Sequence, residues 1–214
     1  MNASKKQPTK SKVSTPAKTR KGAERKKQIL DVCIDILVNK DASQLTMRNI
    51  ASELDLHLSN VQYYFPTRDD IIKALVEYIA QFYTQEVDDL LESAPSEPLP
   101  RFFIMIDYLL EDIRNPRTRR LFLQLWGLLG TLETDGDKIL NRMYLVDIAN
   151  ISRVVAELNP LLTKGVLQQR ATLIAAIMEG MMLMYEDADT ELEEGKESIE
   201  MVLRKQALRI ALDP

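Results

Sequence analysis

The sequence predicts an all-α protein, and three observations support this fold class. Apolar residues recur every three or four positions through most of the 214 residues, which is the period of an amphipathic helix. Only seven glycines and nine prolines interrupt the chain, and runs of β-branched residues are scarce. The composition, 45 % apolar and 28 % charged, is ordinary for a globular protein. A chain of this length can bury one sizeable core or two modest ones.

Charge is divided unevenly along the chain. The formal net charge is −4, but residues 1–75 carry 14 Lys and Arg against 8 Asp and Glu, whereas residues 76–214 carry 14 against 24. A basic front and an acidic back are typical of a nucleic-acid-binding domain joined to a domain that stays off the nucleic acid. We therefore expect a basic arm of residues 1–22, a DNA-binding domain of residues 23–75 and a second helical domain of residues 76–214.

The arm of residues 1–22 contains seven basic residues, no acidic residue and two prolines. Such a segment cannot bury a core, and we expect it to be disordered when free. Two interpretations stand side by side. The arm can lie along phosphates or in the minor groove of DNA, or it is a solubilising tail or a cloning remnant.

Residues 23–75 are expected to begin with three helices. Residues 23–38 form the first helix, with Cys33 on its apolar stripe as a small core residue. A second helix begins after Thr46, whose hydroxyl suits an N-cap. Asp55 opens a tight turn, and residues 58–65 form the third helix. Two short helices joined by a tight turn predict a helix-turn-helix, whose second helix enters the major groove of DNA.

The third helix directs polar side chains away from the core. Its apolar stripe is Leu58, Val61 and Phe65. The side chains that point outward are those of Ser59, Asn60, Gln62 and Tyr63. Asn and Gln can read base edges, and hydroxyl groups can hold phosphates. The same spacing also fits an ordinary helical hairpin with a solvated face, or a helical adaptor that binds a protein through the surface of Tyr63 and Tyr64.

Six further helices are predicted. The first of them, residues 69–93, is long enough to link the two domains, and Arg68 at its start is either solvated or a clamp on a DNA phosphate. Three prolines between residues 95 and 100 end this helix. The others are expected at residues 99–114, 117–129, 137–158, 163–187 and 193–211.

Two segments near the N-terminus carry a family resemblance: RKKQILDVCIDILVNKDASQLTMRNIASEL and QYYFPTRDDII. Over about residues 25–75 they resemble the DNA-binding domain of TetR-family transcriptional regulators. The resemblance implies binding to double-stranded DNA, and it supports the clamp. The residues that it places at the DNA interface are Thr46, Arg48, Leu58, Ser59, Asn60, Gln62, Tyr63, Tyr64 and Arg68. The chain departs from the family pattern at Asp55, where Gly is usual, at His57, where a capping Ser or Thr is common, and at Gln62, where Tyr is frequent.

Large apolar and sulfur-containing side chains gather on the helices after residue 99. Methionine and aromatic groups with a few polar ones suit a small-molecule pocket, and they also suit plain core packing. Because TetR-like proteins carry a cavity between these helices, the resemblance implies a small-molecule effector, apolar or aromatic. The expected lining residues are Tyr108, Gln124, Trp126, Tyr144 and Met178.

The last two helices carry apolar stripes that can pair with their copies as a four-helix bundle, or only cap the core of one protomer. The resemblance implies a homodimer. The expected interface residues are Leu167, Ile174, Met178, Gly180, Met182, Leu203 and Ile210. A two-fold dimer places two recognition helices about one DNA turn apart, which predicts a palindromic operator. We expect a repressor that its ligand releases from DNA.

Motifs for catalysis, metal binding and membrane insertion are missing from the sequence. It has one His and one Cys, no Gly-rich phosphate loop and no zinc-ligand spacing. We therefore expect neither an enzyme nor a bound cofactor or metal. No apolar run approaches the roughly 18–20 residues that span a bilayer, and the basic N-terminus lacks the apolar region of a secretory signal. A cytoplasmic protein without a membrane partner is expected.

Overall fold

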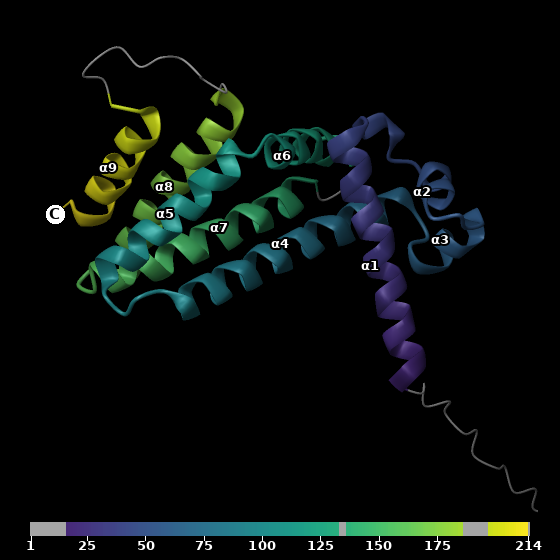
Figure 1. Ribbon diagram of the computed structural model, residues 1–214, viewed down its shortest axis with the longest axis horizontal. Coiled ribbons are helices and arrows are strands. Elements are labelled where there is room, and N and C mark those ends of the chain that lie inside the picture. The colour runs from purple at the N-terminus through teal and green to yellow at the C-terminus, as the bar shows by residue number, and fades with distance from the viewer. Residues whose placement is uncertain (1–15, 133–135, 186–196, 214) are drawn as a thin grey trace, which may run out of the picture.

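The computed structural model describes residues 16–132, 136–185 and 197–213. In this part of the chain, nine α-helices and one 3₁₀ helix, η1 (Ala42–Gln44), form an elongated molecule without strands (Figure 1). The first three α-helices lie at one end and the C-terminal helix lies at the other. The predicted all-α fold is confirmed. None of the described helices is long and apolar enough to cross a membrane.

Helix α1 (Pro16–Asn39) begins seven residues before its predicted start. Residues 16–22, which we expected in the disordered arm, are its first two turns. Lys, Arg and Ala in this stretch are good helix formers, and proline is tolerated at the first helical position. The remainder of the arm, residues 1–15, lies outside the described residues.

The helix-turn-helix consists of α2 (Met47–Glu53) and α3 (Leu58–Tyr64). Thr46 caps α2, because its hydroxyl oxygen accepts a hydrogen bond from the backbone N–H of Asn49 at 3.2 Å. Asp55 turns the chain with a φ of 51°, in the left-handed region. Asp tolerates this conformation better than most residues, so it replaces the glycine that is usual here. His57 precedes α3 without a side-chain capping bond.

The first hydrophobic core joins these helices to the start of the helix that follows them, α4 (Arg68–Ser93). It contains Ile29, Cys33, Leu37, Ile50, Val61, Phe65, Ile71 and Leu75. It also takes Leu125 and Leu129 from α6 (Pro116–Leu129) and Met143 from α7 (Gly136–Leu158). The expected boundary at residue 75 therefore does not separate the two cores, since side chains from beyond it complete the first one.

Helix α4 (Arg68–Ser93) runs without a break from the first core to the second. It begins with a capping box in which Thr67 and Asp70 each accept a hydrogen bond from the other's backbone N–H. Ile72 and Ile79 are buried in the first core, and Val87 and Leu91 in the second. One helix thus touches both the DNA-binding end and the C-terminal end of the molecule.

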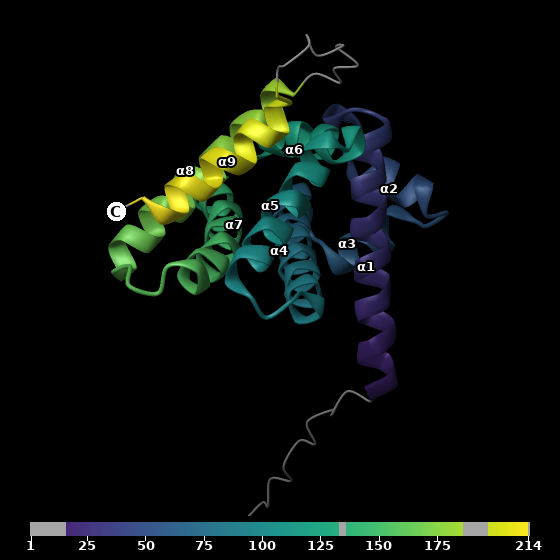
Figure 2. The same cartoon turned by 60° about the vertical axis from the view of Figure 1, so that its left-hand side comes forward.

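The second core lies among α4, α5 (Pro98–Arg114), α7, α8 (Lys164–Met184) and α9 (Ile199–Leu212). Helix α7 lies along α8, and α9 packs on α8 and α5 (Figure 2). The largest buried groups include Phe102, Met105 and Ile106 of α5. The predicted helix at residues 193–211 starts at Ile199, and residues 186–196 lie outside the described residues.

Candidate nucleic-acid interface and effector cavity

Helix α3 exposes the polar face that the sequence predicts. Val61 is buried, whereas Ser59, Asn60, Gln62 and Tyr63 are exposed. Tyr63 is 81 % exposed and meets the half-buried Tyr64 edge-to-face, with ring centroids 5.0 Å apart. A large aromatic side chain this exposed contributes nothing to the core, so its face of α3 is available to a partner.

The other predicted DNA contacts have mixed surroundings. Arg48 and Thr46 are exposed, and Leu58 is half-buried. Arg68 is also half-buried, and its Nε donates a hydrogen bond to the backbone oxygen of Leu45 at 2.9 Å. This bond ties the start of α4 to the segment before α2. Arg68 therefore has a structural role that spacing did not reveal, and its contact with DNA stays a prediction.

The N-terminal part of α1 lies beside α3. Lys21 and Arg25 share a groove of about 400 Å³ with Asn60, Tyr63 and Tyr64. The ammonium group of Lys26 lies 5.8 Å from the ring centroid of Phe65, at the end of α3. Basic groups next to an exposed polar helix face are the arrangement that attracts a phosphate backbone.

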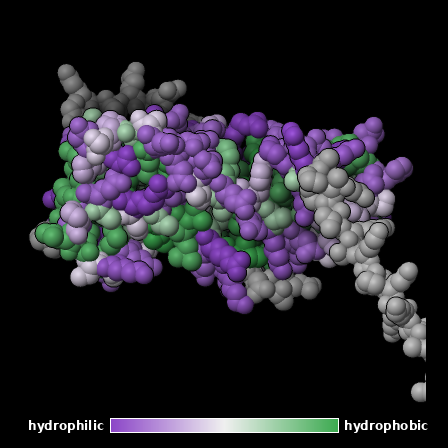
Figure 3. Space-filling model, turned by 90° about the horizontal axis from the view of Figure 1, so that it is seen from below, coloured by the Kyte–Doolittle hydropathy of each residue, from purple (hydrophilic) through white to green (hydrophobic). Residues whose placement is uncertain are grey.

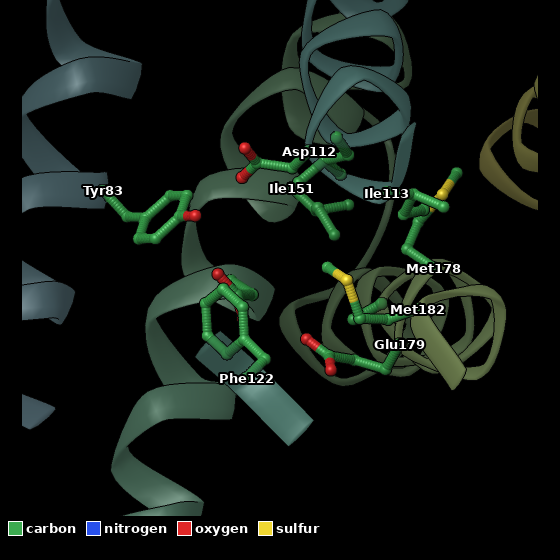
Figure 4. A pocket seen from close by; sticks show the side chains of 11 residues that line it. Tyr83, Asp112, Ile113, Phe122, Ile151, Met178, Glu179 and Met182 are labelled. Carbon is green, nitrogen blue, oxygen red and sulfur yellow. The ribbon is translucent and has the colours of Figure 1, made fainter. Parts of the chain in front are cut away.

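A small cavity of about 40 Å³ lies where five helices of the C-terminal part meet. Its polar lining comes from Tyr83 of α4, Asp112 of α5, Asp147 of α7 and Glu179 of α8. Its apolar lining includes Phe122 of α6, Ile113, Ile151, Met178 and Met182 (Figure 4). The hydroxyl of Tyr83 points toward the carboxyl of Asp112, and Glu179 extends inward from α8 (Figure 4).

Burial raises the pKa of all three carboxyl groups in this cavity. Loss of hydration raises the pKa of Asp112 to about 6. The same loss, reinforced by the nearby Glu179 and Asp112 carboxyls, raises that of Asp147 to about 7. Burial also raises the pKa of Glu179 to about 7, against the opposing effect of a hydrogen bond with Asp147. The three carboxyl groups therefore gain or lose a proton near neutral pH.

The five residues predicted to line an effector pocket do not all lie at one cavity. Met178 lines the cavity. Tyr108 and Trp126 lie behind its aromatic wall, with ring centroids 6.4 Å from Tyr83 and Phe122 respectively. Tyr144 lines a separate groove on the outer side of α7 and α8.

Gln124 does not line this cavity, and its predicted role in ligand binding stays untested. Its Oε1 accepts a hydrogen bond from the backbone N–H of Ala42 at 3.0 Å, so it joins α6 to the DNA-binding end. Spacing along α6 could not show this bond, because Ala42 is 82 positions away in the sequence.

None of the four polar cavity residues was predicted as a site residue from the sequence. Asp112, Asp147 and Glu179 were not singled out, and neither was Tyr83. A signal existed for Asp112, which follows Leu109 and precedes Ile113 on a largely apolar helix face. Its convergence with carboxyls of two other helices is visible only in three dimensions.

Most of the predicted dimer residues are buried within the protomer, and their place in a dimer interface stays a prediction. Ile174, Met178, Met182 and Leu203 are buried, and the remaining three, Leu167, Gly180 and Ile210, are half-buried. These stripes pack α8 and α9 on the second core. The outer face of α8 instead presents Leu173 and Leu183, 56 % and 60 % exposed, with Ala176 between them. Leu145 of α7 is also exposed, on the groove that Ala176 lines.

Comparisons with known proteins identify the fold. No protein-family model matches the sequence. The chain is 27 % identical over 170 residues to an uncharacterised HTH-type transcriptional regulator in the dhlA 5′ region of Xanthobacter autotrophicus, covering 76 % of this chain and 82 % of that protein. Its structure is similar to a TetR transcription regulator from Haloarcula marismortui, with a TM-score of 0.68, 16 % identity and coverage of 88 % and 97 %. It is also similar to the multidrug binding protein EbrR complexed with imidazole, with a TM-score of 0.57, 19 % identity and coverage of 89 % and 96 %. The chain has the fold of TetR-family regulators.

Proposed function

We propose that the protein is a DNA-binding transcriptional regulator that represses its target as a homodimer and is released by a small-molecule effector. The observation that carries this proposal is the exposed polar face of α3, presented by a helix-turn-helix beside basic groups of α1. The relative from Xanthobacter autotrophicus, an HTH-type transcriptional regulator, supports the same class of function. Such a regulator acts in the cytoplasm and needs no catalytic site.

The contacts with DNA divide into two kinds. Asn60 and Gln62 are exposed on α3 and carry amide groups that can bond to adenine in the major groove. Ser59, Tyr63 and Arg48 suit phosphate oxygens, which position the helix without reading sequence. Lys21 and Arg25 of α1 add positive charge beside this face, where it attracts the phosphate backbone.

The homodimer forms, in this proposal, through the outer face of α8 rather than through its buried stripe. Leu173, Ala176 and Leu183 recur at three- and seven-residue spacings on that face. Exposed Leu145 of α7 extends the apolar surface. A two-fold axis through this face makes the two recognition helices symmetric, and symmetric helices require a palindromic operator.

The effector acts through α4. The cavity is too small for a drug-sized ligand as it stands, so a ligand must displace lining side chains, including Tyr83 of α4. Because α4 is continuous with the DNA-binding end, its displacement changes the spacing of the two recognition helices. Ligand then favours the dimer that fits the operator poorly. EbrR, a multidrug binding protein of the same fold, supports a small-molecule site.

Selection from random duplexes tests the DNA-binding function. The full-length protein is mixed with short random duplex DNA, and the bound fraction is sequenced. We expect a palindrome. Gln62→Ala is expected to weaken operator binding by about 1–3 kcal/mol and to relax the preference at one base position in each half-site, because one paired donor and acceptor is lost. Gln81→Ala, an exposed glutamine of α4, serves as the matched control and leaves binding unchanged.

A helical adaptor is the second candidate, and the 81 % exposure of Tyr63 favours it. In that case the selection yields no preferred sequence, and binding is weak and steeply dependent on salt. Tyr63→Ala then disrupts a protein complex and leaves DNA affinity unchanged. The regulator predicts the reverse, which is weaker DNA binding for Tyr63→Ala.

A further inference from the structure

Three carboxyl groups from three helices converge on one cavity. Asp112 belongs to α5, Asp147 to α7 and Glu179 to α8. The other titratable groups that interact with them are acidic or phenolic: Tyr83 and Glu86 of α4, Tyr108 and Glu111 of α5, and Tyr144 of α7. Within residues 16–132, 136–185 and 197–213, no Lys or Arg pairs with any of the three.

This arrangement costs the protein stability. A carboxylate removed from water is unfavourable unless a positive group compensates it, and repulsion among three of them adds to the cost. The raised pKa of each group records that cost. Asn or Leu at these positions would fill a core without this cost. Three buried carboxyls that line one cavity are therefore candidates for binding a ligand that supplies a positive group.

The other walls of the cavity are built for the apolar body of such a ligand. The ring centroids of Tyr83 and Phe122 lie 5.8 Å apart, and Phe122 packs on Trp126. Aromatic faces attract organic cations through their quadrupole. The indole N–H of Trp126 is buried and is the one such side-chain polar atom that lacks a hydrogen-bond partner in the described structure.

A metal ion does not fit the same groups. Among the residues that the structure describes, no three His, Cys, Asp or Glu side chains are close enough to hold one. Hard cations such as Mg²⁺ and Ca²⁺ need six or more oxygen ligands at 2.0–2.6 Å, roughly, and an apolar wall cannot provide them. A larger cation with hydrocarbon substituents can contact both the carboxyl groups and the apolar side chains of the lining.

We propose that the cavity binds an amphiphilic organic cation, an amine or a quaternary ammonium compound, as the effector of this regulator. The positive group faces Asp112, Asp147 and Glu179, and the apolar body lies against Tyr83, Phe122 and Met178. The inference rests on the proposed function for its regulatory meaning, and on the cavity residues alone for its chemistry. It narrows the apolar or aromatic effector expected from the sequence to a cationic one.

The volume of the cavity, about 40 Å³, sets how the cation enters. Room for little more than one water means that side chains must move aside. Met178 and Met182 have flexible thioether chains that can do so. Tyr83 also moves, and it is the cavity residue carried by α4.

Calorimetric titration of the full-length protein tests the charge requirement. Phenyltrimethylammonium and tert-butylbenzene have nearly the same shape, but only the first is charged. At about pH 8, where the three carboxyls are ionised, we expect the cation to bind at least about tenfold more tightly than its neutral isostere. At about pH 5 we expect that preference to disappear, because the carboxyls are protonated.

Two charge-neutralising variants locate the site. Asp147→Asn and Glu179→Gln are each expected to weaken binding of phenyltrimethylammonium by about tenfold and to leave tert-butylbenzene unaffected. Glu92→Gln removes the same charge from an exposed position of α4 and is the matched control. Equal affinity for the two compounds, or equal losses in all three variants, would overturn the proposal. Circular dichroism confirms that each variant is folded.

The same samples separate this proposal from the proposed function. If the protein binds an operator but binds the two compounds with equal affinity, the proposed cation site is contradicted and the proposed regulatory function is not. If the protein prefers the cation but shows no preference for any DNA sequence, the proposed regulatory function is contradicted and the proposed cation site is not. Both together predict that phenyltrimethylammonium weakens operator binding while tert-butylbenzene does not.

Discussion

Asp147 and Glu179 show how single buried carboxyl groups can oppose the stability of the fold. Each has a folded-state pKa of about 7, against about 4 for an exposed carboxyl. Between those two pH values the folded protein holds more protons than the unfolded chain. The contribution of these two groups to stability therefore falls as pH rises from about 4 to about 7, and it is fully lost above that range.

The variant Asp147→Asn is expected to remove part of this loss. We expect its free energy of unfolding to equal that of the wild type near pH 4 and to exceed it by roughly 2 kcal/mol near pH 8, because the amide carries no charge to desolvate. Urea unfolding at a series of pH values measures the difference. Glu92→Gln, which is exposed, is expected to show no such pH dependence. An Asp147→Asn protein no more stable than the wild type at pH 8 would show that the carboxyl has a compensating partner.

At the scale of elements, α4 connects the two ends of the molecule. Its N-terminal capping box and the bond from Arg68 to Leu45 fix it to the helix-turn-helix. Its C-terminal half is anchored by Val87 and Leu91 in the second core. Tyr83 and Gln81 lie in the stretch between these anchors, so this stretch determines whether movement at the cavity reaches the DNA-binding end.

Flexibility introduced at Gln81 is expected to weaken that transmission. Gln81→Gly costs about 1 kcal/mol of helix stability relative to Gln81→Ala, since glycine gains more freedom on unfolding. We expect the glycine variant to keep its operator affinity and lose most of the change in affinity caused by phenyltrimethylammonium. Fluorescence anisotropy with labelled operator, with and without the cation, measures both quantities. An undiminished response in the glycine variant would show that α4 is not the link.

At the scale of the whole molecule, hydrophobic surface remains at the C-terminal end. Figure 3 shows hydrophobic side chains gathered among hydrophilic ones on this part of the molecule, at the left of the view. Leu173, Leu183 and Leu145 are exposed by about half or more. A face of this kind is costly to leave in water, so it suits an interface between two copies.

The variant Leu173→Glu is expected to dissociate the dimer, because two charges would then face each other across the two-fold axis. Light scattering after gel filtration should give the mass of one chain, and operator binding should weaken by more than tenfold, or about 1.4 kcal/mol. Leu161→Glu is the matched control, since Leu161 is 92 % exposed in the connection between α7 and α8. A Leu173→Glu protein that remains dimeric would place the interface elsewhere.

The sequence by itself determined the order and approximate ends of the helices, the helix-turn-helix and its exposed polar face. These follow from local rules, namely helical periodicity, the caps at Thr46 and Thr67 and the prolines that end helices. The sequence also shows the departure at Asp55 in the turn, whereas the left-handed conformation of this residue is a finding of the structure.

Only the tertiary structure decided which face of each long helix is buried and which polar groups meet. Periodicity shows that α8 has an apolar stripe, but not whether Ile174 faces its own core or a second copy. It places Gln124 on α6, but not against Ala42 of η1. Asp112, Asp147 and Glu179 are separated by more than thirty positions along the chain, and their meeting depends on the packing of three helices. Contacts between distant residues are set by how the helices pack together, which no local pattern encodes.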